Sequence, residues 1–174
     1  SDMAIGMGHM FGFTIRENFL HPYGANSMIE FWRRWHVSLS VWFREYLYIP
    51  LGGNRRGRLR TVRNRILVFF CTGLWHGANW KYVGFGLWNG VIIMLSTLLE
   101  PVFEQLAVKL HINVKSFAFR LFQMIRTFVV VLIGYVFDVA PTFTDAMRSF
   151  GKMIADQNFV RDAEAIVGLG LTNY

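Results

Sequence analysis

The feature that most constrains the fold of this chain is an 18-residue run without a charged side chain, from Tyr82 to Leu99. A helix needs about 20 mainly apolar residues to cross the hydrocarbon core of a bilayer, so this run predicts a transmembrane helix. Another uncharged run covers 66–80, and 121–141 can span if Arg126 and Asp138 lie near its two ends. We therefore predict an all-α protein, a multi-pass transmembrane helical bundle with about three hydrophobic elements.

Composition agrees with a membrane protein. Charged residues make up 17% of the chain, against about 25% in a typical soluble domain. The sequence starts at Ser1 without an initiator Met or a signal peptide, so we read it as a piece of a longer protein. Cys71 is the single cysteine, which excludes an intrachain disulfide and a cysteine-based metal site.

Positive charge gathers in the first part of the chain. Residues 1–65 hold ten arginines and four acids, whereas the remainder has a net charge of +1. Six of these arginines fall within eleven residues: Arg55, Arg56, Arg58, Arg60, Arg63 and Arg65. No accompanying motif for reading bases or grooves is present, so we do not expect nucleic acid as a partner. The positive-inside rule instead places the cluster on the cytoplasmic side, where some guanidinium groups could also bind the phosphates of an acyl donor.

We expect residues 1–174 to be the C-terminal part of one membrane domain. Ser27 and Glu30 form a capping-box pattern that starts a helix, and Pro50 ends it. The expected order is the end of a preceding helix and a loop (1–26), an amphipathic helix (27–49), a basic cytoplasmic loop (50–65), hydrophobic helices (66–100), and an amphipathic segment, a last hydrophobic helix and a polar tail (101–174). Glu100-Pro101 should end the long span, and the tail should hold a short helix over 144–154.

A polar stripe runs along the predicted helix 27–49. Arg33, His36, Ser40 and Arg44 are spaced by three, four and four residues, which places them on one helix face. An apolar stripe lies beside it and comprises Met28, Trp32, Trp35, Leu39, Trp42, Tyr46 and Ile49. Such a helix lies at the membrane interface or lines a polar cavity.

A second histidine lies deep in the next hydrophobic segment. His76 follows Arg65 by eleven residues, so a helix would carry it about 16 Å inward. That is half of a roughly 30 Å hydrocarbon core, where an ionisable side chain is by default a functional hypothesis. Gly77 and Asn79 favour a helix break just after it, and Gly73 and Gly86 belong to glycine pairs that permit close helix approach.

Several roles are open to His36 and His76. Either can be a structural histidine bonded to a backbone carbonyl. No metal-ligand spacing surrounds them, so we expect no metal. Ser38 and Ser40 lie near His36, but no strand–turn–helix elbow frames them as nucleophiles. The remaining chemistry is general-base catalysis, because a neutral imidazole titrates near working pH and can take a hydroxyl proton.

Three blocks of this sequence together resemble the membrane-bound O-acyltransferase (MBOAT) family. Within it, they are most similar to the bacterial alginate O-acetyltransferase branch. The blocks are Ser1–Gly6, the segment 31–55 with its Arg-Trp-His and Ile-Pro-Leu-Gly-Gly-Asn motifs, and the Trp-His-Gly-Ala-Asn-Trp motif of 75–80. One departure is Asp138, in the segment 135–140, where this branch often carries an arginine motif.

The resemblance implies a protein more than twice this length, whose helices ring a tunnel through the membrane. It implies that His76 is the catalytic histidine, acting as general base, and that His36 lies across the tunnel. An acetyl group would pass from a cytoplasmic thioester, such as acetyl-CoA, to an extracytoplasmic partner protein that O-acetylates a cell-envelope or extracellular polysaccharide. We expect the bacterial inner (plasma) membrane as the location and no bound cofactor. The weaker candidates for binding donor or substrate are Arg33, Ser40, Arg44 and Asn79.

Two alternatives remain open from the sequence. One is a D-alanyl transferase acting on teichoic acid, a relative with a similar pair of histidines. The Ile49–Asn54 block favours the acetyl branch over it. The other is a non-enzymatic membrane scaffold, which predicts that replacing His76 leaves function intact.

Overall fold

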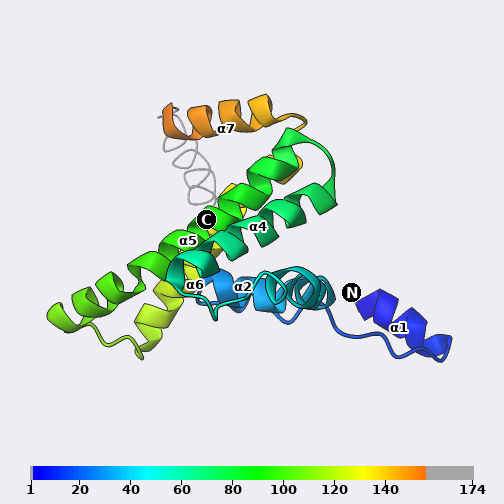
Figure 1. Cartoon of the computed structure of the whole chain (residues 1–174), viewed down its shortest axis with the longest axis horizontal. Helices are drawn as coiled ribbons and strands as arrows, with labels where there is room; N and C mark the ends of the chain where they lie inside the picture. Colours follow the sequence, from blue (N-terminus) through cyan, green and yellow to red (C-terminus); the bar gives the residue numbers. More distant parts are fainter. Residues whose placement is uncertain (1, 156–174) are drawn as a thin grey trace, which may run out of the picture.

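The computed structural model describes residues 2–155, and within this range every regular element is a helix. The elements are α1 (Asp2–Met10), a 3-10 turn η1 (Pro22–Gly24), α2 (Met28–Arg34), α3 (Val37–Phe43), a π-helical segment η2 (Arg44–Tyr48), α4 (Arg58–His76), α5 (Trp80–Lys109), α6 (Phe117–Val139) and α7 (Phe143–Ala155) (Figure 1). The all-α prediction is confirmed, and α7 matches the helix expected over 144–154. The tail beyond 155 lies outside the described residues.

Two helices are long and apolar enough to cross a membrane. They are α5 and α6, and the apolar windows of both are hardly buried within the described chain. A soluble core helix would be mostly buried, so these exposed apolar surfaces suit lipid or further transmembrane helices. The third hydrophobic element that we expected does not qualify by this measure, because the uncharged part of α4 covers only 66–76.

Helix α5 continues past Pro101 to Lys109, so the helix does not end where we predicted that the span ends. Proline has no N–H and cannot bond the carbonyl four residues earlier, here that of Thr97. The Arg58 guanidinium donates to this Thr97 carbonyl, and also to the Leu98 carbonyl at 3.3 Å. A side chain from α4 therefore satisfies the group that the proline leaves unpaired.

The predicted loop 50–65 is shorter in the structure. Helix α4 begins at Arg58, so Arg58, Arg60, Arg63 and Arg65 lie on a helix, and only Arg55 and Arg56 stay in the turn before it. The buried Asn64 of α4 holds that turn against the helix, because its Nδ2 atom donates to the carbonyls of Leu51 and Gly53 at 3.1 Å each. These bonds join residues more than ten positions apart, which local sequence patterns do not encode.

Helices α4 and α5 approach closely where glycines face each other. A Cβ atom on Gly73 would lie 2.3 Å from the Tyr82 carbonyl oxygen, and one on Gly86 would lie 2.3 Å from the Phe69 carbonyl oxygen. No larger residue fits at this distance. The close approach that the glycine pairs predicted is present, and it sets the position of His76 relative to α5.

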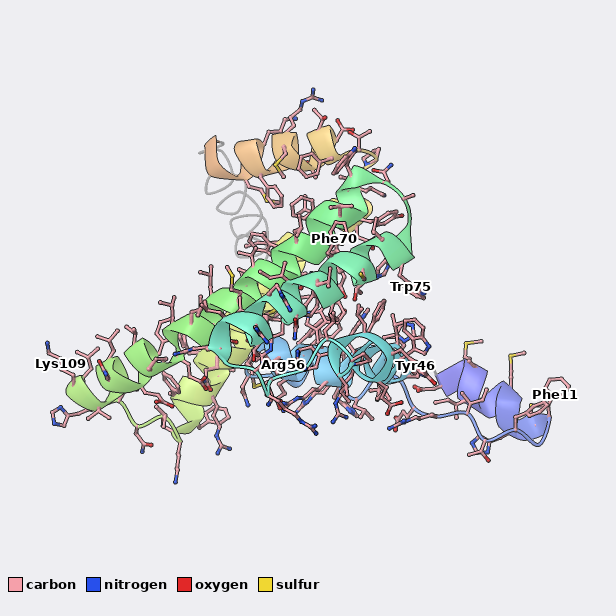
Figure 2. All side chains as sticks on the ribbon, in the orientation of Figure 1. Phe11, Tyr46, Arg56, Phe70, Trp75 and Lys109 are labelled. Carbon is pink, nitrogen blue, oxygen red and sulfur yellow. The ribbon has the colours of Figure 1, made fainter. Side chains whose placement is uncertain are left out.

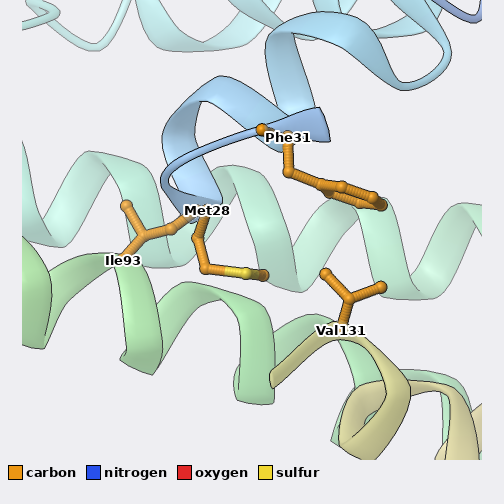
Figure 3. Close-up of a cluster of buried hydrophobic side chains, with 5 residues drawn as sticks. Met28, Phe31, Ile93 and Val131 are labelled. Atoms are coloured by element: carbon orange, nitrogen blue, oxygen red, sulfur yellow. The ribbon is translucent and has the colours of Figure 1, made fainter. Parts of the chain in front are cut away.

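Helix α2 contacts both α5 and α6 and forms a buried apolar cluster with them. Met28 and Phe31 of α2 pack against Ile93 of α5 and Val131 of α6, and all four are buried (Figure 3). Beside them, the Trp32 indole donates to Asn89 Oδ1 of α5 at 3.2 Å. This packing fixes the start of the polar stripe against the two candidate spans.

The continuous helix predicted over 27–49 is wrong, although its start is confirmed. Ser27 Oγ accepts from the Glu30 N–H at 3.2 Å, as the capping pattern predicts. The helix then stops at Arg34, because Trp35 is extended and His36 adopts left-handed backbone angles (φ 48°, ψ 58°). A new helix, α3, starts at Val37 and runs into the π-helical segment η2. The two stripes predicted for one helix are thus divided among three short ones.

Candidate active site

A cavity of about 940 Å³ lies between α4 and the chain from α2 to the turn before α4. His36 and His76 both line it, as do Arg33, Ser40 and Arg44. The structure therefore brings five of the six predicted site residues to one cavity. The polar side chains that join them are Tyr48, Asn54, Arg55, Arg56, Arg65 and Thr72. Figure 2 labels Arg56, in the turn just before α4, and Trp75, at the other end of that helix.

His36 reaches the cavity because the helix is broken at its own position. Its left-handed backbone costs a non-glycine residue about 1–2 kcal/mol, so neighbouring contacts must hold it. Ser40 supplies one of them. Its hydroxyl donates to the carbonyls of Trp32 at 3.1 Å and Trp35 at 3.3 Å, just before the break. Ser40 thus has a structural task in addition to its place in the cavity wall.

His76 is the last residue of α4, and Gly77 ends the helix there. The imidazole stacks on the Tyr82 ring with centroids 6.0 Å apart, and it meets the Phe85 ring edge-on at 5.5 Å. A Cβ atom on Gly77 would lie 2.8 Å from the Tyr82 ring, so glycine leaves room for this stack. The break predicted after His76 is confirmed.

Trp75 connects the two histidines. Its ring centroid lies 5.8 Å from that of His36 and 5.1 Å from that of His76, both in edge-to-face geometry. Neither imidazole makes a hydrogen bond within residues 2–155, and the Nδ1 atom of His36 is buried there without a partner. The two rings are therefore held by aromatic contacts and by their backbone.

Five arginines line the cavity, and no carboxylate among the described residues lines it with them. They come from α2 (Arg33), η2 (Arg44), the following turn (Arg55 and Arg56) and α4 (Arg65). The Arg65 side chain is held in place by a hydrogen bond, which its Nη1 atom donates to Thr97 Oγ1 of α5 at 2.5 Å. This arrangement is strongly positive and favours an anionic ligand.

Asn79 is the predicted site residue that does not line the cavity. It caps α5 instead, since its Oδ1 atom accepts from the Lys81 N–H at 3.1 Å. Lys81, two residues later, donates from Nζ to the carbonyls of Asp138 and Ala140 at 3.0 Å. Both residues thus serve the ends of α5 and α6.

Thr72 is a cavity residue that the sequence patterns did not single out. A signal for it exists, because Arg65, Phe69, Thr72 and His76 are spaced by four, three and four residues. That spacing places them on one face of α4, and all four line the cavity. The charged loop predicted over 50–65 concealed this stripe by cutting α4 short.

Comparison with known proteins identifies the family of this chain. A model of the membrane-bound O-acyltransferase family matches residues 1–137. The probable alginate O-acetylase AlgI of Pseudomonas syringae is 43% identical over 155 residues, which are 89% of this chain and 28% of that protein. The peptidoglycan O-acetyltransferase of Helicobacter pylori is 37% identical over 88% of this chain and 28% of its own length.

A third relative is more distant. The teichoic acid D-alanyltransferase of Bacillus subtilis is 30% identical over 105 residues, which cover 56% of this chain and 26% of that protein. This chain thus spans less than a third of the length of each of these relatives. The family match and the two exposed apolar helices α5 and α6 together identify a membrane protein. The chain belongs to the membrane-bound O-acyltransferase family.

Proposed function

We propose that the full-length protein is an O-acyltransferase that moves an acetyl group from a cytoplasmic thioester donor across the membrane. The observation that carries this proposal is the shared cavity that contains His36, His76 and five arginines. The relatives named alginate O-acetylase and peptidoglycan O-acetyltransferase support acetyl as the group and a polysaccharide of the cell envelope or extracellular space as its destination.

The arginines suit the donor. Acetyl-CoA carries several phosphate charges at one end and the thioester at the other. Arg55 and Arg56, in the turn before α4, would bind the phosphates, and Arg33 and Arg44 line the same cavity as His36. No cofactor is needed beyond this donor substrate.

His76 would act as the general base. Its imidazole takes the proton of an acceptor hydroxyl while the hydroxyl oxygen attacks the thioester carbonyl carbon. The new oxygen–carbon bond forms, the carbon–sulfur bond breaks, and the imidazolium returns its proton to the leaving thiolate. His36, whose ring also contacts Trp75, would orient the acceptor or polarise the thioester carbonyl.

The position of His76 along α5 supports an acceptor that enters from the face opposite the donor. Arg65 bonds Thr97, whereas His76 contacts Tyr82 and Phe85. Phe85 and Thr97 are twelve residues apart, about 18 Å along a helix. Half of the hydrocarbon core is about 15 Å. His76 would therefore lie within the apolar stretch, in the half away from the arginines.

We further propose a multi-pass protein of the bacterial inner (plasma) membrane, with the arginine-rich end in the cytoplasm. The acetyl group would leave on the opposite side to an extracytoplasmic partner protein that modifies the polysaccharide. Purified protein that acetylated polysaccharide without any partner would contradict this relay.

The decisive experiment is transfer of labelled acetyl from acetyl-CoA by full-length protein in inverted membrane vesicles. His76→Asn should lose at least about 10²-fold in transfer rate, the usual worth of a general base. His111→Asn is the matched control, because His111 lies exposed in the turn after α5 and outside the cavity. Transfer that survives in His76→Asn would remove His76 from its role and shift the assignment to His36.

D-alanyl transfer is a second candidate, supported by the likeness to teichoic acid D-alanyltransferase. The same vesicles, given an alanyl carrier protein in place of acetyl-CoA, would distinguish the two donors. A scaffold without enzymatic activity would transfer neither group, and its function would survive His76→Asn.

A further inference from the structure

We propose that Asn18 is a positioning residue that holds His36 in the cavity by keeping the helix broken at Trp35–His36. The inference rests on the proposed function, in which His36 takes part in acyl transfer. Asn18 lies outside the three sequence blocks that resemble the family, and it does not line the cavity itself. It would therefore act through the backbone of the residues that follow His36.

Asn18 bonds the first two residues after His36. Its backbone carbonyl accepts from the Val37 N–H at 3.1 Å. Its Oδ1 atom accepts from the Ser38 N–H at 2.9 Å and from the Ser38 hydroxyl at 2.6 Å. One residue thus satisfies the first two N–H groups of α3, which a helix cannot satisfy by itself.

These bonds replace those of a continuous helix. In an uninterrupted helix over 27–49, the Ser38 N–H would bond the Arg34 carbonyl four residues earlier. In the structure, the Arg34 carbonyl accepts instead from the Leu20 N–H at 2.9 Å, and Ser38 turns to Asn18. The segment 18–20 therefore bonds both the Arg34 carbonyl and the Ser38 N–H, which would bond each other if the helix were continuous.

The break needs such support because the sequence over 27–49 has the periodicity of one helix. His36 also occupies the left-handed region, which is unfavourable for a residue with a side chain. Its ring makes no hydrogen bond within residues 2–155 and meets Phe19 at 6.0 Å and Trp75 at 5.8 Å between centroids. The backbone therefore decides where the imidazole points, and Asn18 secures that backbone.

The test is acetyl transfer by the full-length protein with Asn18→Ala and Asn18→Asp. Alanine removes both hydrogen bonds to Oδ1, and we expect kcat to fall roughly 10- to 100-fold, with little change in KM for acetyl-CoA. Aspartate keeps an acceptor oxygen at the same place and should restore most of the lost activity. Equal loss in both variants would overturn the proposal.

Asn113→Ala is the matched control. The Oδ1 atom of Asn113 also accepts from a backbone N–H, that of Lys115 at 3.0 Å, but Asn113 lies in the turn between α5 and α6. It should leave kcat unchanged. If Asn18→Ala does not accumulate in membranes, Asn18→Gln takes its place, because the extra methylene moves the amide oxygen away from the Ser38 N–H and hydroxyl that it now accepts from. Full kcat in Asn18→Gln would then overturn the proposal.

A double-mutant cycle separates this inference from the proposed function. If Asn18 acts through His36, Asn18→Ala should cause no further loss in a His36→Ala background. An additional loss of the same size would overturn the inference and leave the role of His36 standing. Wild-type transfer by His36→Ala alone would instead remove His36 from the proposed function, and the inference would fail with it.

Discussion

Trp32 joins the wall of the cavity to α5 through one hydrogen bond. Its indole nitrogen can only donate, and it donates to Asn89 Oδ1, while Asn89 Nδ2 donates to the Phe85 carbonyl at 2.8 Å. Asn89 is 3% exposed, so its amide depends on these two partners. At the scale of the residue, a hydrogen bond to the buried Asn89 therefore fixes α2 against α5 and thereby the position of the break that follows α2.

Trp32→Phe should lower the free energy of unfolding by about 1–3 kcal/mol, because it leaves the buried Asn89 oxygen without a donor. Thermal unfolding of the full-length protein in detergent measures this loss. Trp42→Phe serves as the control, since Trp42 is half exposed. Equal melting temperatures for the two variants would show that the Trp32–Asn89 bond contributes nothing.

At the scale of the element, a side chain of α4 compensates for the hydrogen bond that α5 loses at Pro101. Pro101 leaves the Thr97 carbonyl unpaired within α5, and Arg58 of α4 donates to it. Local rules therefore end the helix at Glu100, whereas the packed structure extends it to Lys109. Arg58 thus contributes to the stability of α5, although it lies 39 residues before Thr97 in the sequence.

Arg58→Ala should destabilise the protein by about 1 kcal/mol, the net worth of a hydrogen bond at a partly exposed site. In a Pro101→Ala background the loss should vanish, because the substituted alanine supplies the missing N–H to the Thr97 carbonyl. Thermal unfolding of the four proteins of this cycle tests the coupling. Arg60→Ala, an exposed arginine on the same helix, controls for the charge. Equal losses in both backgrounds would refute the coupling.

At the scale of the whole molecule, positively charged side chains gather at one end of the group formed by α4, α5 and α6. Arg58 and Arg65 of α4 bond Thr97 and Leu98 of α5, on the side of the last residue of α5, Lys109, and of Lys115 in the α5–α6 turn. The 30 residues of α5 span about 45 Å, longer than the roughly 30 Å core. The charged end of α5 therefore extends beyond the apolar region on the arginine-rich side.

This division predicts opposite accessibility for cysteines placed at the two ends. In a Cys71→Ala background, Asn113→Cys should react with a membrane-impermeant maleimide in inverted vesicles, whereas Ala78→Cys should react in right-side-out vesicles. Ala78 lies in the turn between α4 and α5, and Asn113 in the turn between α5 and α6. Labelling of both from the same side would contradict the proposed orientation and with it the entry of the donor near Arg55.

The sequence by itself determined the features that depend on near neighbours. Apolar runs specify α5 and α6, Ser27 specifies the start of α2, and the histidine-containing motifs indicate the family. The polar spacing of Arg33, His36, Ser40 and Arg44 also identified cavity residues correctly, even though the helix expected to carry them is broken. The four side chains still line one cavity although the helix is broken between them, because the break does not change their chemical type or their short separation in the sequence.

Only the tertiary structure decided where helices break, begin and continue. The break at His36 depends on Asn18, 20 residues before Ser38, and the extension of α5 depends on Arg58. Asn79 illustrates the reverse, because the family motif suggested a binding role and the fold uses it as a helix cap. The physical reason is the same in each case. A backbone group takes whichever partner the folded chain brings within hydrogen-bond distance, and local periodicity does not contain that information.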